Sequence, residues 1–279
     1  MTFRTEIGDI LGSFKIGHDD RIVMLGSCFA DNVGTRLERD GFNVVHNPLG
    51  PLFNPASIVN ILSRGGRPYS AEDFVQHDGT WHCLDFASRY RAGSPEFLAD
   101  MVNADYLALW DAFERATVCI ITFGTNKVYE YDGRVAGNCH KLPASMFTER
   151  FLSVDEIRRK WEWFTIDDGK SIFTLSPVKY PGDGLAQSCL SKSTLRVALD
   201  GICSEGGYDY FPSYEIVTED LRDYRFYAAD LKHPSDVAVD YIYDIFSKTY
   251  FTPETAATAL RFRKEYLKSQ HRPILDSKQ

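Results

Sequence analysis

The segment Arg21-Ile22-Val23-Met24-Leu25-Gly26-Ser27-Cys28-Phe29-Ala30 joins a short apolar run to a Gly-Ser turn. The run from Ile22 to Leu25 is continuous, which is typical of a strand that is buried on both faces of a sheet. Gly26 permits a tight turn, and the pattern of Asp31 to Arg39 indicates a helix. We therefore expect Ser27 at the carboxyl end of a central strand, the edge where open α/β sheets bind their ligands.

Strands and helices alternate along the rest of the chain, which predicts a parallel sheet with helices on both faces. The further predicted strands are Phe42 to His46, Val118 to Phe123, Ile172 to Leu175 and Tyr208 to Glu215. The further predicted helices are Pro95 to Thr117, Ser153 to Trp163, Leu185 to Ile202, Ser235 to Phe246 and Thr252 to Lys268.

No composition shift or linker divides the chain, so we expect one domain over residues 1–279. Residues 51–97 separate the second and third predicted strands and are rich in proline and glycine. We expect them to form an insertion beside the site, much of it loop. The polar tail from Ser269 to Gln279 is expected to fray beyond the last helix.

Charge and hydropathy argue against two classes of partner. The net charge of −8 does not favour a nucleic-acid partner, which calls for a basic surface. No apolar run reaches the roughly 18 residues that a membrane span requires, and Met1 to Glu6 lack the apolar core of a signal peptide. The six cysteines include no CxxC pair, and several lie in apolar contexts. We expect them to be reduced, and the protein to be cytoplasmic.

Ser27 and the downstream pair Asp230 and His233 are the candidate catalytic residues. Pro234 follows the pair, which favours a loop or single turn ahead of the helix that begins near Ser235. In such a turn the carboxylate can bind one nitrogen of His233 while the other nitrogen reaches Ser27. Serine, imidazole and carboxylate in this order form an acyl-transfer site.

Each of these residues also has a plainer interpretation. Ser27 has the position of a helix N-cap, and Asp230 and His233 can be an ordinary surface pair. Cys28 is a competing nucleophile, since a thiol at a helix N-terminus can have a lowered pKa, but its apolar neighbours favour a side chain turned toward the core.

Several residues near the expected edge could supply hydrogen bonds to an oxyanion. Asn47 and Gly50 follow the second strand, and Asn126 follows the third. Asn138 and His140 lie further along, in Gly137-Asn138-Cys139-His140-Lys141. All of them can equally be ordinary turn residues.

Metal and nucleotide chemistry have little support in the sequence. A zinc site would use His82, Cys83, Cys139 and His140, but directly adjacent ligands do not match the usual spacing of structural zinc. Neither a GxxxxGK[ST] loop nor a GxGxxG fingerprint is present. We expect no metal and no organic cofactor.

The charged and aromatic segment from Leu221 to Tyr227 precedes Asp230. Its arginines are expected to pair with carboxylates, including Glu215 and Glu219. The alternative is that Arg222 or Arg225 binds an anionic substrate.

These motifs resemble the bacterial GSCFA-domain family, an outlying branch of the SGNH (GDSL-like) hydrolases. Gly26-Ser27-Cys28-Phe29-Ala30 spells the family's name. The resemblance covers roughly residues 20 to 250 and is carried further by Asn47-Pro48 with Gly50, Asn54-Pro55, Gly124-Thr125 with Val128-Tyr129-Glu130, Asn138 to Lys141, Ser176-Pro177-Val178, Ser191-Lys192, Phe211 to Glu215, Leu221 to Tyr227 and Asp230 to Pro234.

The resemblance implies a flavodoxin-like three-layer α/β/α sandwich with a mainly parallel five-stranded sheet. It also implies that Ser27, His233 and Asp230 form a catalytic triad, with an oxyanion hole from the amides of Ser27 and Gly50 and the side chain of an asparagine. That asparagine is Asn126 or Asn138, because the usual Gly-x-Asn-Asp block reads Gly124-Thr125-Asn126-Lys127 here.

The function expected on this basis is a serine esterase that cleaves O-acyl esters, with a carbohydrate or another small molecule as substrate. An acyltransferase would use the same acyl-enzyme. A catalytically silent glycan-binding module is the alternative outside enzymes. The sequence gives no indication of the oligomeric state.

Overall fold

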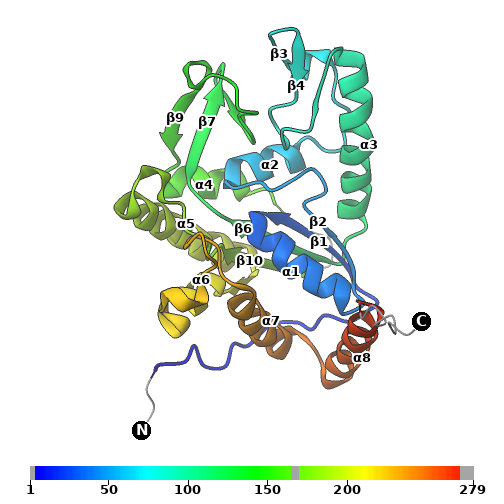
Figure 1. The fold of residues 1–279 in the computed structure, drawn as a ribbon, viewed down its shortest axis with the longest axis vertical. Helices are drawn as coiled ribbons and strands as arrows, with labels where there is room; N and C mark the ends of the chain where they lie inside the picture. Colours follow the sequence, from blue (N-terminus) through cyan, green and yellow to red (C-terminus); the bar gives the residue numbers. More distant parts are fainter. Residues whose placement is uncertain (1–3, 165–169, 271–279) are drawn as a thin grey trace, which may run out of the picture.

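Five parallel strands form the central sheet, in the order β2-β1-β6-β10-β11 (Figure 1). They are β1 (Arg21–Gly26), β2 (Asn43–His46), β6 (Val118–Phe123), β10 (Ser171–Leu175) and β11 (Asp209–Phe211). Taken in chain order this is 2-1-3-4-5, the order of flavodoxin-like doubly wound sheets. The computed structural model describes residues 4–164 and 170–270. The predicted parallel α/β sheet is confirmed.

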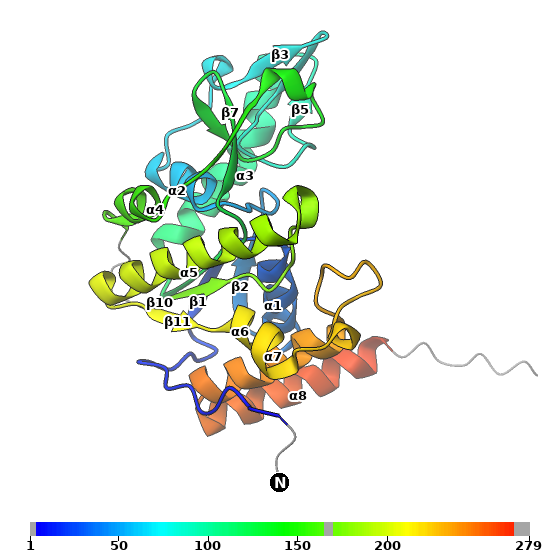
Figure 2. The same ribbon diagram turned by 90° about the vertical axis from the view of Figure 1, so that its left-hand side faces the viewer.

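Helices cover both faces of this sheet, with α7 and α8 below it and α5 above it in Figure 2. The helices are α1 (Cys28–Arg39), α2 (Pro55–Ser63), α3 (Pro95–Glu114), α4 (Val154–Trp161), α5 (Leu185–Gly206), α6 (Ser213–Glu215), α7 (Asp236–Tyr250) and α8 (Pro253–Gln270). None of them, in the part of the chain that is described, is both long enough and apolar enough to cross a bilayer.

Strand β1 shows why the sheet is buried on both sides. Ile22 and Met24 pack into a core cluster with α1, α7 and α8, whereas Val23 and Leu25 pack into the opposite cluster with α2, α3 and α5. Successive side chains of a strand point to opposite faces, so an apolar run without alternation fills both cores.

Two small antiparallel sheets lie beyond the carboxyl edge of the main sheet. One contains β3 (Val75–His77), β4 (Thr80–His82) and β5 (Arg91–Ala92), and it lies in the predicted insertion. The other contains β7 (Lys127–Tyr131), β8 (Arg134–Ala136) and β9 (Thr148–Phe151). We call them the first and second lobe; both stand at the top of Figure 1.

The second lobe is not among the elements predicted from the sequence. Its signal is the dipeptide Asp132-Gly133 between β7 and β8, where both residues have positive φ (48° and 73°). Two such residues form the turn that a two-residue hairpin requires. Asp78-Gly79 makes the same turn in the first lobe, with φ values of 45° and 74°.

The predicted strand Tyr208 to Glu215 is wrong over its second half. β11 ends at Phe211, and Ser213–Glu215 begins a helical segment that continues as a π-helix over Ile216–Leu221. Pro212 cannot donate to a sheet ladder, and the hydroxyl of Ser213 donates to the carbonyl of Leu175 at 2.8 Å. The chain therefore leaves the sheet early.

The other element boundaries differ by a few residues. Helix α3 ends at Glu114 rather than Thr117, α4 ends at Trp161 rather than Trp163, and α5 extends to Gly206. Ser269 and Gln270 are helical, and the rest of the tail expected to fray, residues 271–279, lies outside the described residues.

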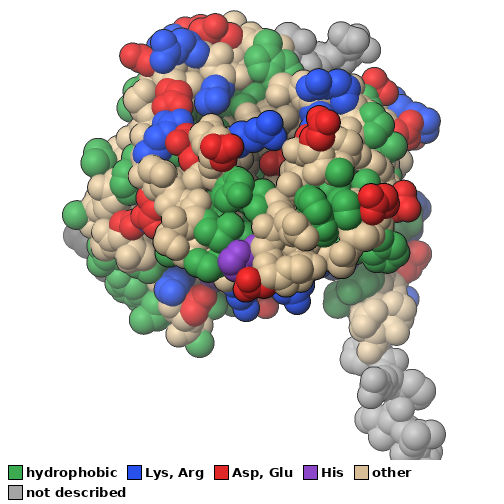
Figure 3. Space-filling view, turned by 90° about the horizontal axis from the view of Figure 1, so that it is seen from above, with side chains coloured by type: hydrophobic (Ala, Val, Ile, Leu, Met, Phe, Trp, Pro, Cys, Tyr) green, Lys and Arg blue, Asp and Glu red, His purple; other side chains and the backbone are tan. Residues whose placement is uncertain are grey.

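Acidic and basic side chains are interspersed over the face seen in Figure 3, and hydrophobic side chains gather near its middle. That face therefore presents mixed charge rather than one basic surface.

Candidate active site

Ser27 lies between β1 and α1, where strand order reverses between β1 and β6. It is the N-cap of α1, and its Oγ accepts a hydrogen bond from the Phe29 N–H at 3.3 Å. The plainer interpretation of Ser27 is thus correct as local structure. The same position is also the switch point at which doubly wound sheets bind ligands.

Gly26 and Asn47 hold the turn that presents Ser27. The Gly26 N–H donates to Asn47 Oδ1 at 2.9 Å, and Asn47 Nδ2 donates to the Ser27 carbonyl at 3.3 Å. Gly26 has φ +143°, and a Cβ there would lie 2.2 Å from the carbonyl oxygen of Thr122. The backbone of β6 thus requires glycine at this point, and the Asn47 amide is engaged in shaping the turn.

Asp230 and His233 form the predicted turn directly before α7. Asp230 Oδ2 lies 2.5 Å from His233 Nδ1, and Oδ1 accepts the N–H groups of Lys232 and His233 at 2.9 and 3.0 Å. The ring's hydrogen bond holds the pKa of the Asp230 carboxyl well below its usual range. Leu231 takes a left-handed conformation (φ 57°), which closes the turn.

Ser27 and His233 line one cavity of about 350 Å³ at the carboxyl edge of the sheet. Cys28, Gly124, Lys179 and Lys232 also line it. Among the described residues no hydrogen bond joins Ser27 Oγ to His233; the oxygen accepts the Phe29 N–H, and the hydroxyl proton is left free to be donated. The structure therefore places Ser27 and His233 at one cavity, and a hydrogen bond links Asp230 to His233.

Cys28 also borders this cavity, but its thiol is not activated. Burial, together with the nearby Asp31 charge, raises its pKa above the ordinary value. A raised pKa reduces the thiolate population, so the position at a helix N-terminus does not make Cys28 a good nucleophile.

Several predicted oxyanion donors are occupied by other acceptors. The Gly50 N–H donates to the Asn47 carbonyl at 2.8 Å. Asn126 Nδ2 donates to the Leu152 carbonyl at 2.8 Å, where it ties the end of β6 to the second lobe. The Ser27 N–H has a longer bond, 3.3 Å, to the Thr122 carbonyl. Gly50 and Asn126 do not line the Ser27 cavity.

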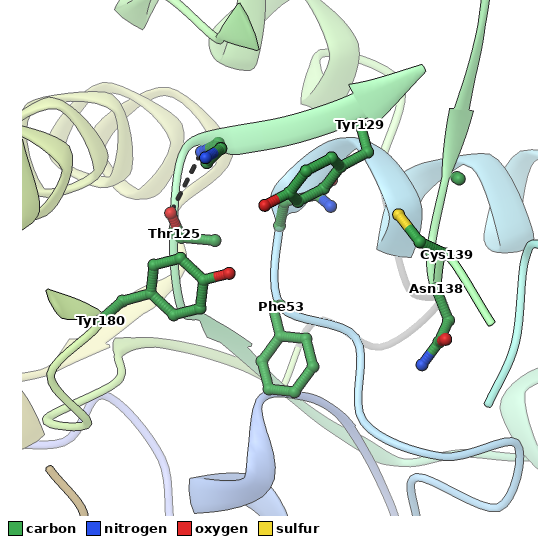
Figure 4. Close-up of a pocket in the computed structure, with 10 residues that line it drawn as sticks. Phe53, Thr125, Tyr129, Asn138, Cys139 and Tyr180 are labelled. Atoms are coloured by element: carbon green, nitrogen blue, oxygen red, sulfur yellow. Dashed lines mark hydrogen bonds between the residues drawn. The ribbon is translucent and has the colours of Figure 1, made fainter. Parts of the chain in front are cut away.

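Asn138 lines a second cavity of about 160 Å³, which shares Phe53, Thr125 and Tyr180 with the first. Figure 4 shows Tyr180 and Asn138 on opposite sides of the Phe53 ring. Asn138 Oδ1 accepts the His140 N–H at 2.8 Å, and its Nδ2 has no hydrogen-bond partner among the residues that the structure describes. Its amide donor therefore remains available.

His140 lies away from both cavities and pairs with His82. Their Nδ1 atoms are 3.2 Å apart, and His140 Nε2 lies 3.0 Å from the Phe86 carbonyl. Burial lowers the pKa of His140 to about 4 and also lowers the pKa of His82, and the contact between the two rings links the two lobes. Within residues 4–164 and 170–270, no three His, Cys, Asp or Glu side chains are arranged to hold a metal ion.

Lys192, which belongs to the Ser191-Lys192 motif but was given no role from the sequence, is a buried ionisable side chain. Its Nζ donates to the carbonyls of Gly124 and Ser176, both at 2.7 Å, and so ties together the segments that follow β6 and β10. Both segments border the Ser27 cavity. Lys192 shares a helical face with the buried Leu195 and Leu199, three and seven positions on. That spacing was the available signal.

Burial of Lys192 makes the protein's stability depend on pH. Its pKa is lowered to about 7, whereas an unfolded lysine titrates near 10.4. Between these values the unfolded chain binds more protons, so the free energy of unfolding rises with pH. This lysine alone should contribute a rise of about 2 kcal/mol between pH 7 and pH 9.

Urea denaturation at several pH values between 7 and 9 gives the free energy of unfolding of the wild type and of Lys192→Met. The difference between their slopes of unfolding free energy against pH measures the contribution of Lys192. Lys264→Met, on the exposed part of α8, is the matched control and should keep the wild-type slope. Equal slopes for the wild type and Lys192→Met would show that Lys192 does not titrate in this range.

The arginines before Asp230 pair mainly as expected, but not with Glu215. Arg222 lies 3.9 Å from Glu219, and Arg225 lies 3.9 Å from Asp223. Glu215 instead contacts Arg196 at 3.1 Å. Neither Arg222 nor Arg225 lines the Ser27 cavity.

Comparison with known proteins gives a family but no close relative. Neither the curated proteins nor the solved structures include a significant match to this chain. The GSCFA family profile matches residues 21–246, which contain the turn of Ser27, the turn of Asp230 and His233, and all five strands of the main sheet. The chain belongs to the GSCFA family.

Proposed function

We propose that the chain is a serine hydrolase of the SGNH type that cleaves O-acyl esters through an acyl-enzyme on Ser27. The observation that carries this proposal is the shared cavity: a serine at the switch point of the sheet and a histidine already bonded to a carboxylate line the same 350 Å³ space. The volume is within the usual range of small-molecule sites.

The Asp230–His233 bond prepares the imidazole for base catalysis. With Nδ1 bonded to the carboxylate, Nε2 is the nitrogen left to accept a proton. As Ser27 Oγ bonds to the ester carbonyl carbon, the hydroxyl proton passes to Nε2. The imidazolium then protonates the departing alkoxide, and water releases the acyl group by the same steps in reverse order.

The Ser27 oxygen can keep accepting the Phe29 N–H while its own proton is donated to His233. At 3.3 Å that hydrogen bond is long, so it places little constraint on rotation of the hydroxyl. Catalytic hydrogen bonds are often long or absent before substrate binds.

For the oxyanion we propose the Ser27 amide, because its N–H has only a long bond of 3.3 Å, to the Thr122 carbonyl, to exchange. Asn138 has an unused amide but lines the neighbouring cavity beyond Phe53, so it would have to reach past that ring to join the Ser27 amide. Gly50 and Asn126 remain candidates if substrate displaces their present acceptors. This chemistry needs neither a metal nor an organic cofactor.

The second cavity supports a substrate larger than a simple acetyl ester. Tyr129 and Asn138 line this second cavity, and Asn138 lies on the other side of the Phe53 ring from Tyr180. Such polar and aromatic groups suit a carbohydrate or a comparable small alcohol. Transfer of the acyl group to another alcohol would use the same intermediate. A cytoplasmic location, expected from the cysteine pattern, stays part of this proposal.

A fluorophosphonate probe tests the proposal directly, since it phosphonylates an activated serine. Peptide mass spectrometry of the labelled wild type should place the adduct on Ser27, and Ser27→Ala should remain unlabelled. An unlabelled wild type that also leaves aryl acetates intact would exclude the hydrolase and favour a binding module.

A further inference from the structure

We propose that Lys179 and Lys232 form an anion-binding subsite of the Ser27 cavity, so that the preferred ester carries a negatively charged group. This inference rests on the proposed function, because it names the class of substrate for the same site. Both lysines line the cavity together with Ser27 and His233.

The two lysines lie side by side because their backbones are joined. The Lys179 N–H donates to the Lys232 carbonyl at 3.0 Å, which connects the segment after β10 to the turn of Asp230 and His233. The proposed general base, His233, directly follows Lys232 in the sequence. An anion held here would lie next to the reacting ester.

Lys179 is held in place without losing its charge. Its Nζ lies 3.9 Å from the ring centroid of Tyr224 and 4.0 Å from that of Tyr227. An aromatic face attracts a cation through its quadrupole but carries no net charge. The ammonium group is therefore positioned by two tyrosines beside the cavity and keeps its charge, so an anion that enters the cavity along Lys179 can bind to it.

No carboxylate cancels these charges at the cavity wall. None of the cavity's lining residues is Asp or Glu, and neither lysine has a salt bridge within the described part of the chain. Asp230 is the neighbouring acid; it stays ionised, but it does not line the cavity and its two oxygens are directed to the His233 ring and to two backbone N–H groups. In a chain of net charge −8, a wall with lysines and no acid selects for anions.

This assignment also gives a role to the segment from Leu221 to Tyr227. Arg222 and Arg225 do not line the Ser27 cavity and pair with nearby acids, so the subsite proposed here does not use them. The segment acts instead through Tyr224 and Tyr227, which position Lys179.

The experiment compares esters that differ chiefly in charge, with the uncatalysed rate of each ester subtracted. 4-Nitrophenyl hemisuccinate against 4-nitrophenyl butyrate places the charge on the acyl side, and 4-acetoxybenzoate against 4-acetoxybenzamide places it on the alcohol side. In at least one pair the wild type should show a higher kcat/KM for the anion. Lys179→Met and Lys232→Met should each lower the anion-to-neutral ratio of kcat/KM about tenfold.

Lys264→Met removes the same charge from α8 and is the matched control, with no expected change in the ratio. The preference should also shrink between 20 mM and 500 mM salt, because ions screen a partly exposed site. Hydrolysis of both neutral esters with no anion preference in either pair, or a ratio that neither lysine variant changes, would overturn the subsite while leaving the hydrolase intact.

Failure of the hydrolase itself gives a different pattern, in which no ester is cleaved and no serine is labelled. Calorimetric titration with inorganic phosphate then tests the subsite alone. Binding that Lys179→Met and Lys232→Met abolish and Lys264→Met retains would support it. No binding to the wild type would refute it.

Discussion

Ser27→Ala should lower kcat for aryl-acetate hydrolysis by about 10⁴- to 10⁶-fold. Alanine cannot form the acyl-enzyme, and the remaining rate would come from the oxyanion donors and substrate binding alone. Because Ser27 is also the N-cap of α1, the substitution should cost about 1 kcal/mol of unfolding free energy. Steady-state kinetics and urea denaturation on the same preparation separate the two effects.

Cys28→Ala is the matched control, since Cys28 borders the same cavity one residue further along. Its kcat should stay within about threefold of the wild type, because burial keeps the thiol protonated. Loss of activity in Cys28→Ala with full activity in Ser27→Ala would reverse the assignment and make the protein a thiol enzyme.

Asp230→Asn should lower kcat about 10⁴-fold with little change in fold. The carboxylate accepts hydrogen bonds only, and it fixes the His233 tautomer with its proton on Nδ1. An asparagine can turn its NH₂ toward Nδ1, which would place the ring proton on Nε2 and leave no base for Ser27.

The pH profile provides a second test of Asp230. Its pKa is held low by the His233 hydrogen bond, so the native carboxylate stays ionised throughout the measurable range. The Asp230→Asn defect should therefore persist at every pH above about 5 rather than recover on the alkaline side. Asp236→Asn, at an exposed carboxylate in the first turn of α7, is the control and should retain wild-type kcat. A defect of less than tenfold in Asp230→Asn would remove Asp230 from the triad.

The sequence determined the sheet and its carboxyl edge. Continuous apolar runs such as Ile22 to Leu25 fit only strands buried on both faces, and the helical segments between them require parallel crossovers. The turn of Asp230 and His233 was equally predictable, because its hydrogen bonds join residues no more than three positions apart and Pro234 marks its end. Local patterns of this kind need no knowledge of distant contacts.

Only the tertiary structure decided which neighbours each side chain met. Asn126 follows a strand at the expected edge, yet its amide bonds to Leu152, which arrives from the second lobe. Lys192 faces the interior because two strand ends present carbonyls to it, and Lys179 lies between two tyrosines some 45 residues later in the chain. A hydrogen-bond donor takes the acceptor that folding brings nearest, and that acceptor is set by packing between segments remote in sequence rather than by the residue's own neighbours.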